Sequence, residues 1–588
     1  MTPHDEEVLG KAYDARLMRR LLTYLRPYKR QVVFAIAAII GHAVLELTPP
    51  YLTKVVIDRY IPARDLSGLG LIAALYLVTL TGAFVLEFIQ TWTMQMTGQR
   101  IMFDLRMQIY EHLQRLDLRF YDRNPVGRLM TRVTTDVDVL NELFTAGVVS
   151  VFGDVFTLVG IMGMLIWMDW RLALVAFSVL PLIVLITQWF RRNVRDSYRT
   201  VRIWIARINA FLQERITGMA TVQLFRREAQ DFAAFDAIDR SHRDANVESI
   251  FYYALFYPGI ELVSALAASL IIWVGGGWVL RDALTLGSLV AFLQYSQRFF
   301  RPISDMSEKF NTLQGAMASS ERIFALLDTP VEIQAPREVV RVRPGVIRFE
   351  NVTFAYVAGE PVLRNVSFEV APGQRVGIVG ATGSGKTTLV SLLLRFYDVQ
   401  AGRITIDGVD IRSMDLQALR AMFGLVLQDV HLFSGTIAGN VRLGNDAIDD
   451  QAVRAAVEAV RADVFIDQLP QGMNTPVAER GATLSVGQKQ LLSFARALAF
   501  NPPVLILDEA TSSVDTETEL LIRDALKTLM RGRTTLAIAH RLSTIQDMDR
   551  ILVFHKGTLR ESGTHQELLA RRGIYHRLYE LQFAQRVA

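Results

Sequence analysis

Long apolar runs crowd into the first half of the chain, and each has about 20 residues or more, the length that a helix needs to cross a bilayer. They fall near residues 32–56, 69–94, 148–168, 172–190, 252–280 and 284–300. One such run can be a buried helix of a soluble domain, but six together indicate a membrane domain. We therefore expect an all-α transmembrane domain of six helices in a lipid bilayer.

The connections between these runs alternate in length and in charge. Short ones lie near residues 62–67, 169–171 and 281–282, whereas the two long ones, near 99–147 and 191–249, are rich in arginine. The positive-inside rule places the arginine-rich connections and both termini in the cytoplasm. Apolar residues in the long connections keep helical spacing, so the helices should continue out of the membrane as cytoplasmic stalks. The stalks should turn near 116–121 and 216–222.

Ionisable residues interrupt the apolar runs. Charge in hydrocarbon is costly, so such residues should face a cavity or pair with one another. The six are His42, Glu46, Lys54, Glu87, Asp154 and Glu261. For Glu46, Glu87 and Glu261, a cavity wall that contacts substrate and a structural hydrogen bond are both open interpretations, and the role of His42 in the cavity is open as well. Kinks and freed backbone carbonyls are expected at four prolines, Pro49, Pro50, Pro181 and Pro258.

The pattern changes after residue 327. Residues 328–344 contain prolines and lose helical periodicity, which predicts a linker. Beyond it, the stretches 346–350, 352–354 and 366–370 alternate apolar and polar residues, as antiparallel strands do. The expected domains are a transmembrane domain at 1–327, a linker at 328–344 and a second domain at 345–588.

The second domain contains a glycine-rich sequence between a predicted strand at 375–379 and a predicted helix at 388–396. From Gly380 to Thr387 it reads G-x-x-x-x-G-K-T. Its glycines let backbone N–H groups close around phosphate oxygens, the helix N-terminus favours anions, and the lysine reaches the outer phosphates. The hydroxyl of Thr387 would bind Mg²⁺. The predicted nucleoside triphosphate site consists of Gly380, Thr382, Gly383, Ser384, Gly385, Lys386, Thr387 and Thr388.

Two further stretches can complete this site. The apolar run 504–507 ends in Asp508 and Glu509, about 120 residues after the glycine-rich loop, where one carboxylate supports Mg²⁺ and the next can deprotonate an attacking water. A second stretch precedes a helical run and can present a serine hydroxyl and free N–H groups at a helix N-terminus, which is another anion site. It consists of Leu484, Ser485, Val486, Gly487 and Gln488.

With these motifs the chain resembles the ATP-binding cassette (ABC) exporter half-transporters of the type IV fold, in which a six-helix transmembrane domain with long stalks is fused to an α/β P-loop cassette, here at 345–588. The resemblance implies a bacterial inner-membrane ATPase that couples ATP hydrolysis to transport, with the cassette in the cytoplasm and with ATP and Mg²⁺ as cofactors. Glu509, His540 and Lys386 would then be catalytic. Tyr356 would stack on adenine. Gln428 and Thr387 would bind Mg²⁺, with Asp508 behind them. Asp515 would lie in the loop after Glu509.

In this family the signature, here 484–488, completes the ATP site of another cassette, so a dimer is implied. The sequences 484–496 and 45–51 are similar to the catalytically complete half of heterodimeric multidrug exporters, so we favour a heterodimer with a second half-transporter over a homodimer. The expected activity is efflux of hydrophobic or amphipathic small molecules by alternating access. One alternative is a homodimeric lipid or glycolipid flippase. A more remote alternative is a cassette ATPase without transport, against which the membrane runs argue.

Composition narrows the function further. With 588 residues the chain is too long for one ordinary core, and 51% of its residues are hydrophobic. It has no cysteine, which excludes disulfides, thiolate metal sites and cysteine nucleophiles. A formal net charge of +4 is mild, so no nucleic-acid partner is expected.

Overall fold

The computed structural model describes residues 14–334, 340, 343–509, 516–539 and 545–587 of the chain. The chain divides into two compact units. The first comprises Met1–Gln114 and Val126–Thr329, and the second comprises Arg115–Pro125 and Pro330–Ala588. The tip of the first stalk, residues 115–125, therefore belongs with the second unit.

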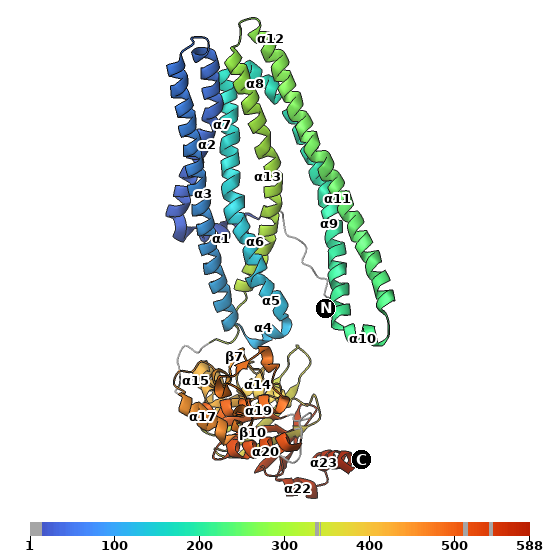
Figure 1. Ribbon diagram of the computed structural model, residues 1–588. Helices are drawn as coiled ribbons and strands as arrows, with labels where there is room; N and C mark the ends of the chain where they lie inside the picture. Colours follow the sequence, from blue (N-terminus) through green and yellow to red (C-terminus); the bar gives the residue numbers. More distant parts are fainter. Residues whose placement is uncertain (1–13, 335–339, 341–342, 510–515, 540–544, 588) are drawn as a thin grey trace. The chain divides into compact units, whose positions relative to one another are not determined.

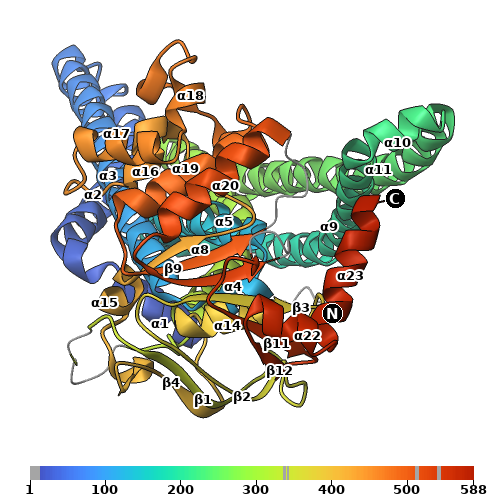
Figure 2. The same cartoon turned by 90° about the horizontal axis from the view of Figure 1, so that it is seen from below.

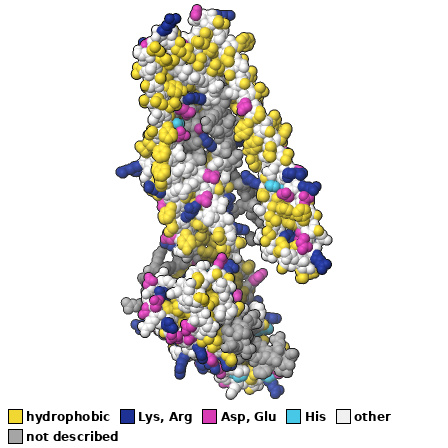
Figure 3. Space-filling view, in the orientation of Figure 1, with side chains coloured by type: hydrophobic (Ala, Val, Ile, Leu, Met, Phe, Trp, Pro, Cys, Tyr) yellow, Lys and Arg dark blue, Asp and Glu magenta, His cyan; other side chains and the backbone are white. Residues whose placement is uncertain are grey.

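Within the described residues, six long helices form most of the first unit. Five stretches of this unit are long and apolar enough to cross a membrane, and the sixth predicted run, 284–300, lies on the last of the long helices. Hydrophobic side chains cover the upper parts of these helices, whereas Lys and Arg gather toward the lower end of the α9–α11 hairpin (Figure 3). The long helices are α2 (Lys29–Val55), α3 (Leu66–Arg115), α7 (Val149–Met168), α9 (Leu180–Thr217), α11 (Glu228–Leu270) and α13 (Leu286–Leu327).

The stalks turn where the sequence predicted. Helix α3 ends at Arg115 and α9 ends at Thr217. A short helix follows each turn, α4 (Leu118–Arg123) and α10 (Met219–Leu224). Helices α9 and α11 run side by side and diverge from the other long helices toward α10 (Figure 1), joined near that end by the rings of Phe211 and Phe235 at 6.0 Å.

Shorter helices connect the long ones and cover their ends. Helix α1 precedes α2, and a π-helical turn at Val56–Tyr60 follows α2. Helices α5 and α6 pack near the lower part of α13, and α12 follows a π-helical turn at Ile271–Gly275. Their bounds are α1 (Ala15–Thr23), α5 (Val126–Val133), α6 (Thr135–Glu142), α8 (Trp170–Phe177) and α12 (Gly276–Val279).

The prolines act in two different ways. The predicted run 172–190 is not one helix, because α8 ends at Phe177 and Pro181 lies in the first turn of α9, where its missing N–H costs nothing. By contrast, α2 continues through Pro49 and Pro50. Pro50 has no N–H for the carbonyl of Glu46, and Nη1 of Arg298 on α13 donates to that oxygen at 2.6 Å. The carbonyl that the proline frees is therefore satisfied from another helix.

The second unit contains two main sheets. A four-stranded antiparallel sheet has the order β2-β1-β4-β5, and a six-stranded sheet has the order β12-β11-β3-β10-β9-β6, with five parallel strands and β12 antiparallel at its edge. The expected antiparallel strands before the glycine-rich loop are β1 and β2. The strands of both sheets are β1 (Ile347–Phe354), β2 (Leu363–Val370), β3 (Arg375–Gly380), β4 (Ala401–Ile406), β5 (Val409–Asp410), β6 (Phe423–Val426), β9 (Val504–Glu509), β10 (Thr534–Ala539), β11 (Arg550–His555) and β12 (Thr558–Gly563).

Helices cover both faces of the six-stranded sheet, as Figure 2 shows. Leu505 and Leu507 point into the core under α19 and α20, whereas Val504 and Ile506 point into the core shared with α14 and the antiparallel sheet. A parallel sheet buried on both faces explains why the strands read as continuous apolar runs. The covering helices include α14 (Lys386–Leu393), α15 (Leu416–Ala421), α16 (Ile437–Arg442), α17 (Asp450–Ala459), α18 (Asp463–Ile466), α19 (Val486–Ala499), α20 (Thr516–Met530), α22 (His565–Ala570) and α23 (Ile574–Val587).

Candidate functional site

Several of the predicted site residues, among those that the structure describes, lie at one edge of the six-stranded sheet. Strands β3, β10, β9 and β6 are parallel neighbours, so their carboxyl ends lie at the same edge. Gly380 ends β3, Asp508 and Glu509 end β9, and Gln428 comes two residues after β6. In open α/β sheets, ligands bind outside this edge. The tertiary structure therefore brings together motifs that lie far apart in the sequence.

The glycine-rich loop has a backbone that side chains would not tolerate. Gly383 and Gly385 have φ of 78° and 96°, in the left-handed region that favours glycine. A Cβ on Gly380 would lie 2.3 Å from the carbonyl oxygen of Phe554, and one on Gly385 would lie 2.6 Å from Leu363 Cδ2. The glycines therefore let the loop pass close to β11 and β2, in a compact path whose backbone can surround an anion.

Two side chains of the loop are suited to bind phosphate. Nζ of Lys386 donates to the carbonyl oxygens of Gly380 and Ala381, at 2.9 and 3.1 Å, so the ammonium group lies over the loop itself. Burial lowers the pKa of Lys386, and the charge of Asp508 opposes that shift. The Ser384 hydroxyl is buried and has no hydrogen-bond partner among the described residues. An anion in the loop would satisfy both groups, so the residues fit a triphosphate.

The proposed Mg²⁺ ligands are oxygen donors at the same edge. Thr387 is exposed in the first turn of α14, Gln428 is exposed after β6, and Asp508 is half-buried. Hydroxyl, amide and carboxylate oxygens suit a hard divalent cation. Thr388 is buried behind the loop, and its Oγ1 accepts a hydrogen bond from the hydroxyl of Tyr356 at 3.3 Å, so the predicted adenine-stacking residue does lie beside the loop.

Three of the predicted residues are only partly covered by the structure. Glu509 is described as the last residue of β9, where its backbone pairs with Ala539 of β10. His540 follows directly in the chain, and both His540 and Asp515 lie outside the described residues. The roles assigned to Glu509, His540 and Asp515 stay predictions.

The signature stretch forms the beginning of a helix, as predicted. Ser485 is the N-cap of α19, and its Oγ accepts the N–H of Gln488 at 3.2 Å while Gln488 Oε1 accepts the N–H of Ser485 at 2.9 Å. This reciprocal capping holds the turn rigidly. Ser485 and Val486 are exposed, and Gly487 is buried. The helix N-terminus is therefore accessible to a ligand that a second cassette would carry.

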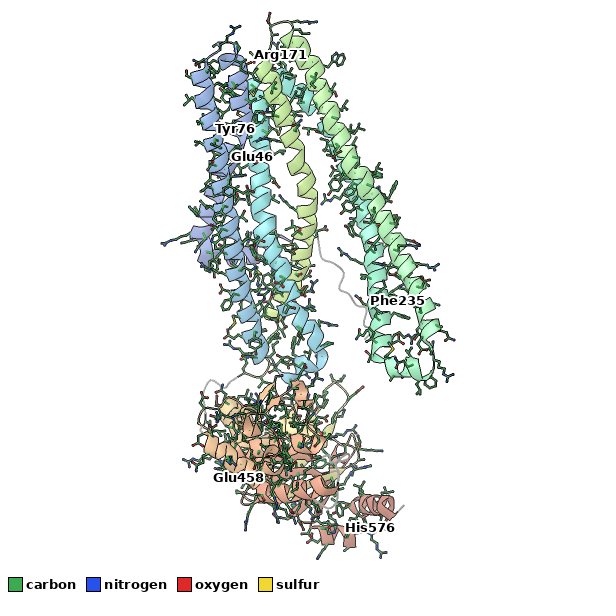
Figure 4. The ribbon with its side chains drawn as sticks, viewed as in Figure 1. Glu46, Tyr76, Arg171, Phe235, Glu458 and His576 are labelled. Atoms are coloured by element: carbon green, nitrogen blue, oxygen red, sulfur yellow. The ribbon has the colours of Figure 1, made fainter. Side chains whose placement is uncertain are left out.

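The ionisable residues of the membrane helices separate into pairs and exposed groups. His42 Nε2 lies 3.8 Å from Glu46 Oε2, and Nδ1 of His42 lies 3.0 Å from the carbonyl oxygen of Ala83. Figure 4 labels Glu46 on α2. Glu87 and Glu261 are exposed.

Asp154 of α7 was expected to face a cavity or to pair, and it forms a close ion pair with Lys309 of α13, a partner that the sequence did not predict. Charged groups of opposite sign 155 positions apart give no signal in a single sequence.

Comparison with known proteins identifies both units. Residues 32–303 match the ABC transporter transmembrane region, and residues 363–512 match the ABC transporter domain. A probable multidrug resistance ABC transporter ATP-binding/permease protein of Bacillus subtilis, YheH, is 38% identical over 89% of this chain and 78% of its own length. An ATP-dependent lipid A-core flippase of Thiobacillus denitrificans is 37% identical over 97% and 99%. The structure of a bacterial Atm1-family ABC exporter with ATP bound matches with a TM-score of 0.77 and 30% identity, over 94% of this chain and 98% of that one.

Proposed function

The chain belongs to the ABC transporter family as an exporter half-transporter of the bacterial inner membrane, and from this premise we propose that it expels hydrophobic or amphipathic compounds of the multidrug type. Its energy source is ATP hydrolysis, and exporters of this kind work as dimers. The arrangement that most supports the proposal is the sheet edge that gathers the phosphate loop, Asp508 and Glu509 in a chain that also carries membrane helices.

Each site residue then receives a role in the hydrolysis of ATP. Lys386 would bind the outer phosphates and stabilise the charge that develops during in-line attack, and Glu509 would orient and deprotonate the attacking water. His540 would hold the γ-phosphate, and Tyr356 would stack on adenine. When bound by Thr387 and Gln428, with Asp508 behind them, Mg²⁺ would neutralise phosphate charge.

The partner in the dimer is proposed to be a different half-transporter. The similarity of residues 484–496 to the catalytically complete half of heterodimeric exporters supports this choice. The exposed N-terminus of α19 would complete the partner's ATP site, and the partner's signature would complete the site at Lys386. A second half-transporter encoded beside this one, without the carboxylate that corresponds to Glu509, would support the heterodimer.

The test is ATP turnover and transport by the complex, isolated from its own cells with any partner it carries and placed in liposomes. Lipophilic compounds should stimulate turnover. Glu509→Gln and Lys386→Ala should each abolish the turnover of this chain's site and the movement of a fluorescent lipophilic dye. Glu519→Gln, a carboxylate change on α20 ten residues from Glu509, serves as the control and should leave both intact. Unaltered turnover and transport in Glu509→Gln would reject the mechanism.

A homodimeric flippase for lipid or glycolipid is the second candidate. It is favoured by the relative in Thiobacillus denitrificans named as a lipid A-core flippase, whose whole length this chain nearly covers. It is also favoured by the presence of both Glu509 and His540 in one chain, because two copies could then hydrolyse ATP at both sites. Stimulation of a purified homodimer by acidic glycolipid, with no response to lipophilic dyes, would decide for this candidate.

A further inference from the structure

Three aromatic rings of the second unit form a cluster beside the phosphate loop. Tyr397, in the turn after α14, is 7% exposed, and its ring lies 5.2 Å from that of Tyr356 with the planes at 90°. Phe354 completes the cluster, with ring distances of 4.9 Å to Tyr356 and 5.7 Å to Tyr397. Edge-to-face contacts depend on ring orientation, so a shift of one ring disturbs the other two.

The two tyrosine hydroxyls tie this cluster to different parts of the unit. Tyr356 bonds to Thr388, two residues after Lys386 in α14. The hydroxyl of Tyr397 donates a hydrogen bond to the carboxylate of Asp122 on α4, at the tip of the first stalk. Burial and this carboxylate both raise the pKa of Tyr397, so its hydroxyl keeps its proton and remains the donor.

Further contacts fasten the stalk tip to the second unit. The carboxylate of Asp117 accepts the backbone N–H groups of Glu332 and Ile333, at 2.7 and 3.2 Å, and Arg119 pairs with Glu332 at 3.2 Å. These bonds hold residues that precede β1. The bond from Tyr397 instead leads to the rings beside the phosphate loop.

We infer that Tyr397 is a positioning residue that links the base-stacking ring of Tyr356 to the stalk tip through Asp122, so that the arrival of a purine base is transmitted to residues 115–125 of the same chain. The inference rests on the proposed function, in which Tyr356 stacks on adenine. The ring of Tyr397 would orient Tyr356, and its hydroxyl would carry the link to α4. These two parts can be removed separately.

The experiment uses the chain's lack of cysteine. Arg123→Cys, at the exposed end of α4, introduces a single thiol for an environment-sensitive fluorophore, and the complex with the unsubstituted chain gives the labelling background. The probes are MgATP and the magnesium salt of inorganic triphosphate, which has no base. MgATP should change the emission of the label, and triphosphate should change it less.

Tyr397→Phe keeps the ring and removes the hydroxyl. It should reduce the change evoked by MgATP at least about threefold, since a charge-assisted bond is lost, while the ATP half-saturation of turnover changes less than about twofold. Tyr397→Leu also removes the ring and should raise the half-saturation roughly two- to tenfold. Asp122→Ala should reproduce Tyr397→Phe, and the double variant should add nothing further.

A matched control is Tyr575→Phe, which removes another buried tyrosine hydroxyl of this unit, one bonded to His565 at 2.7 Å. It should leave the label response unchanged, which separates the link from a general loss of stability. An unchanged emission response of the label in Tyr397→Phe would overturn the inference. So would an equal emission response to triphosphate and to MgATP in the chain that keeps Tyr397. Absence of ATP turnover in the unsubstituted, unlabelled complex would instead count against the proposed function.

Discussion

At the scale of single residues, Asp136 is a buried carboxylate that several polar and charged side chains contact. It lies on α6 with 6% exposure, accepts a hydrogen bond from Ser319 at 3.0 Å and forms ion pairs with Arg322 and Arg132. A buried carboxylate is tolerated because these donors replace its water. The network therefore joins α6 to α13 below the membrane runs.

Asp136→Asn should lower the free energy of unfolding by about 1–3 kcal/mol, because it removes the buried negative charge that pairs with Arg322 and Arg132. Thermal unfolding of the detergent-solubilised protein measures the change. Asp138→Asn is the control two positions away, where a side chain with 65% exposure pairs with Arg106, and it should cost less than about 0.5 kcal/mol. Equal losses of unfolding free energy for the two substitutions would show that the burial of Asp136 does not increase its contribution to stability.

The pH dependence of this contribution follows from the same contacts. Burial by itself would raise the pKa of Asp136, but the hydrogen bond and charge of Arg322, with Ser319 and Arg132, hold the pKa below its ordinary value. As the pH falls, Asp136 is therefore protonated in the unfolded chain before it is protonated in the folded chain. The stabilisation is complete above the unfolded pKa of about 4 and is lost as the pH falls through the lower folded pKa.

The difference in unfolding temperature between the unsubstituted protein and Asp136→Asn should accordingly stay constant from pH 7 to pH 5 and narrow below about pH 4. Unfolding scans of both proteins across this range give the measurement. A difference that widened on acidification would contradict the sign of the shift.

At the scale of elements, the seam between α2 and α13 depends on a proline. Pro50 leaves the carbonyl of Glu46 without its helical partner, and Arg298 supplies the donor. The hydroxyl of Tyr295 bonds to the next carbonyl, that of Leu47, at 2.5 Å. Two side chains of α13 thus donate hydrogen bonds to backbone carbonyls of α2.

Arg298→Met should lower the unfolding temperature, since a carbonyl within the membrane run loses its donor. In a Pro50→Ala background residue 50 has an N–H of its own, so the same substitution should cost less, with a coupling of at least about 0.5 kcal/mol. Pro258→Ala, in α11, is the control background and should leave the cost of Arg298→Met unchanged. Additive costs with Pro50→Ala would show that the arginine does not serve this carbonyl.

At the scale of the whole molecule, the choice between dimers can be tested by complementation. In a homodimer, a mixed pair of Lys386→Ala and Ser485→Arg chains keeps one intact site, made of Lys386 from one copy and Ser485 from the other. Co-expression would then restore roughly a quarter of the ATP turnover, because half of the random pairs are mixed. For the proposed heterodimer, partner-free protein should show no turnover with either chain or with both, because the site at Lys386 then lacks the partner's signature. Recovery near that level in purified, partner-free protein would establish the homodimer.

The sequence alone determined the features whose causes are local. The length of an apolar run decides whether it can cross a bilayer, and the order strand, G-x-x-x-x-G-K-T, helix decides the backbone of a phosphate loop. The stalk turns and the cap of α19 follow from equally short stretches. For these features the neighbouring residues supply nearly all of the relevant energy.

Only the tertiary structure decided which distant groups meet. Tyr397 and Asp122 are 275 positions apart, Arg298 and Glu46 are 252 apart, and Arg322 and Asp136 are 186 apart. Each partner alone is an ordinary polar residue, with many sterically acceptable neighbours. The pairing is selected by how whole helices and sheets pack, since burial makes an unsatisfied polar group costly only after the chain has folded around it.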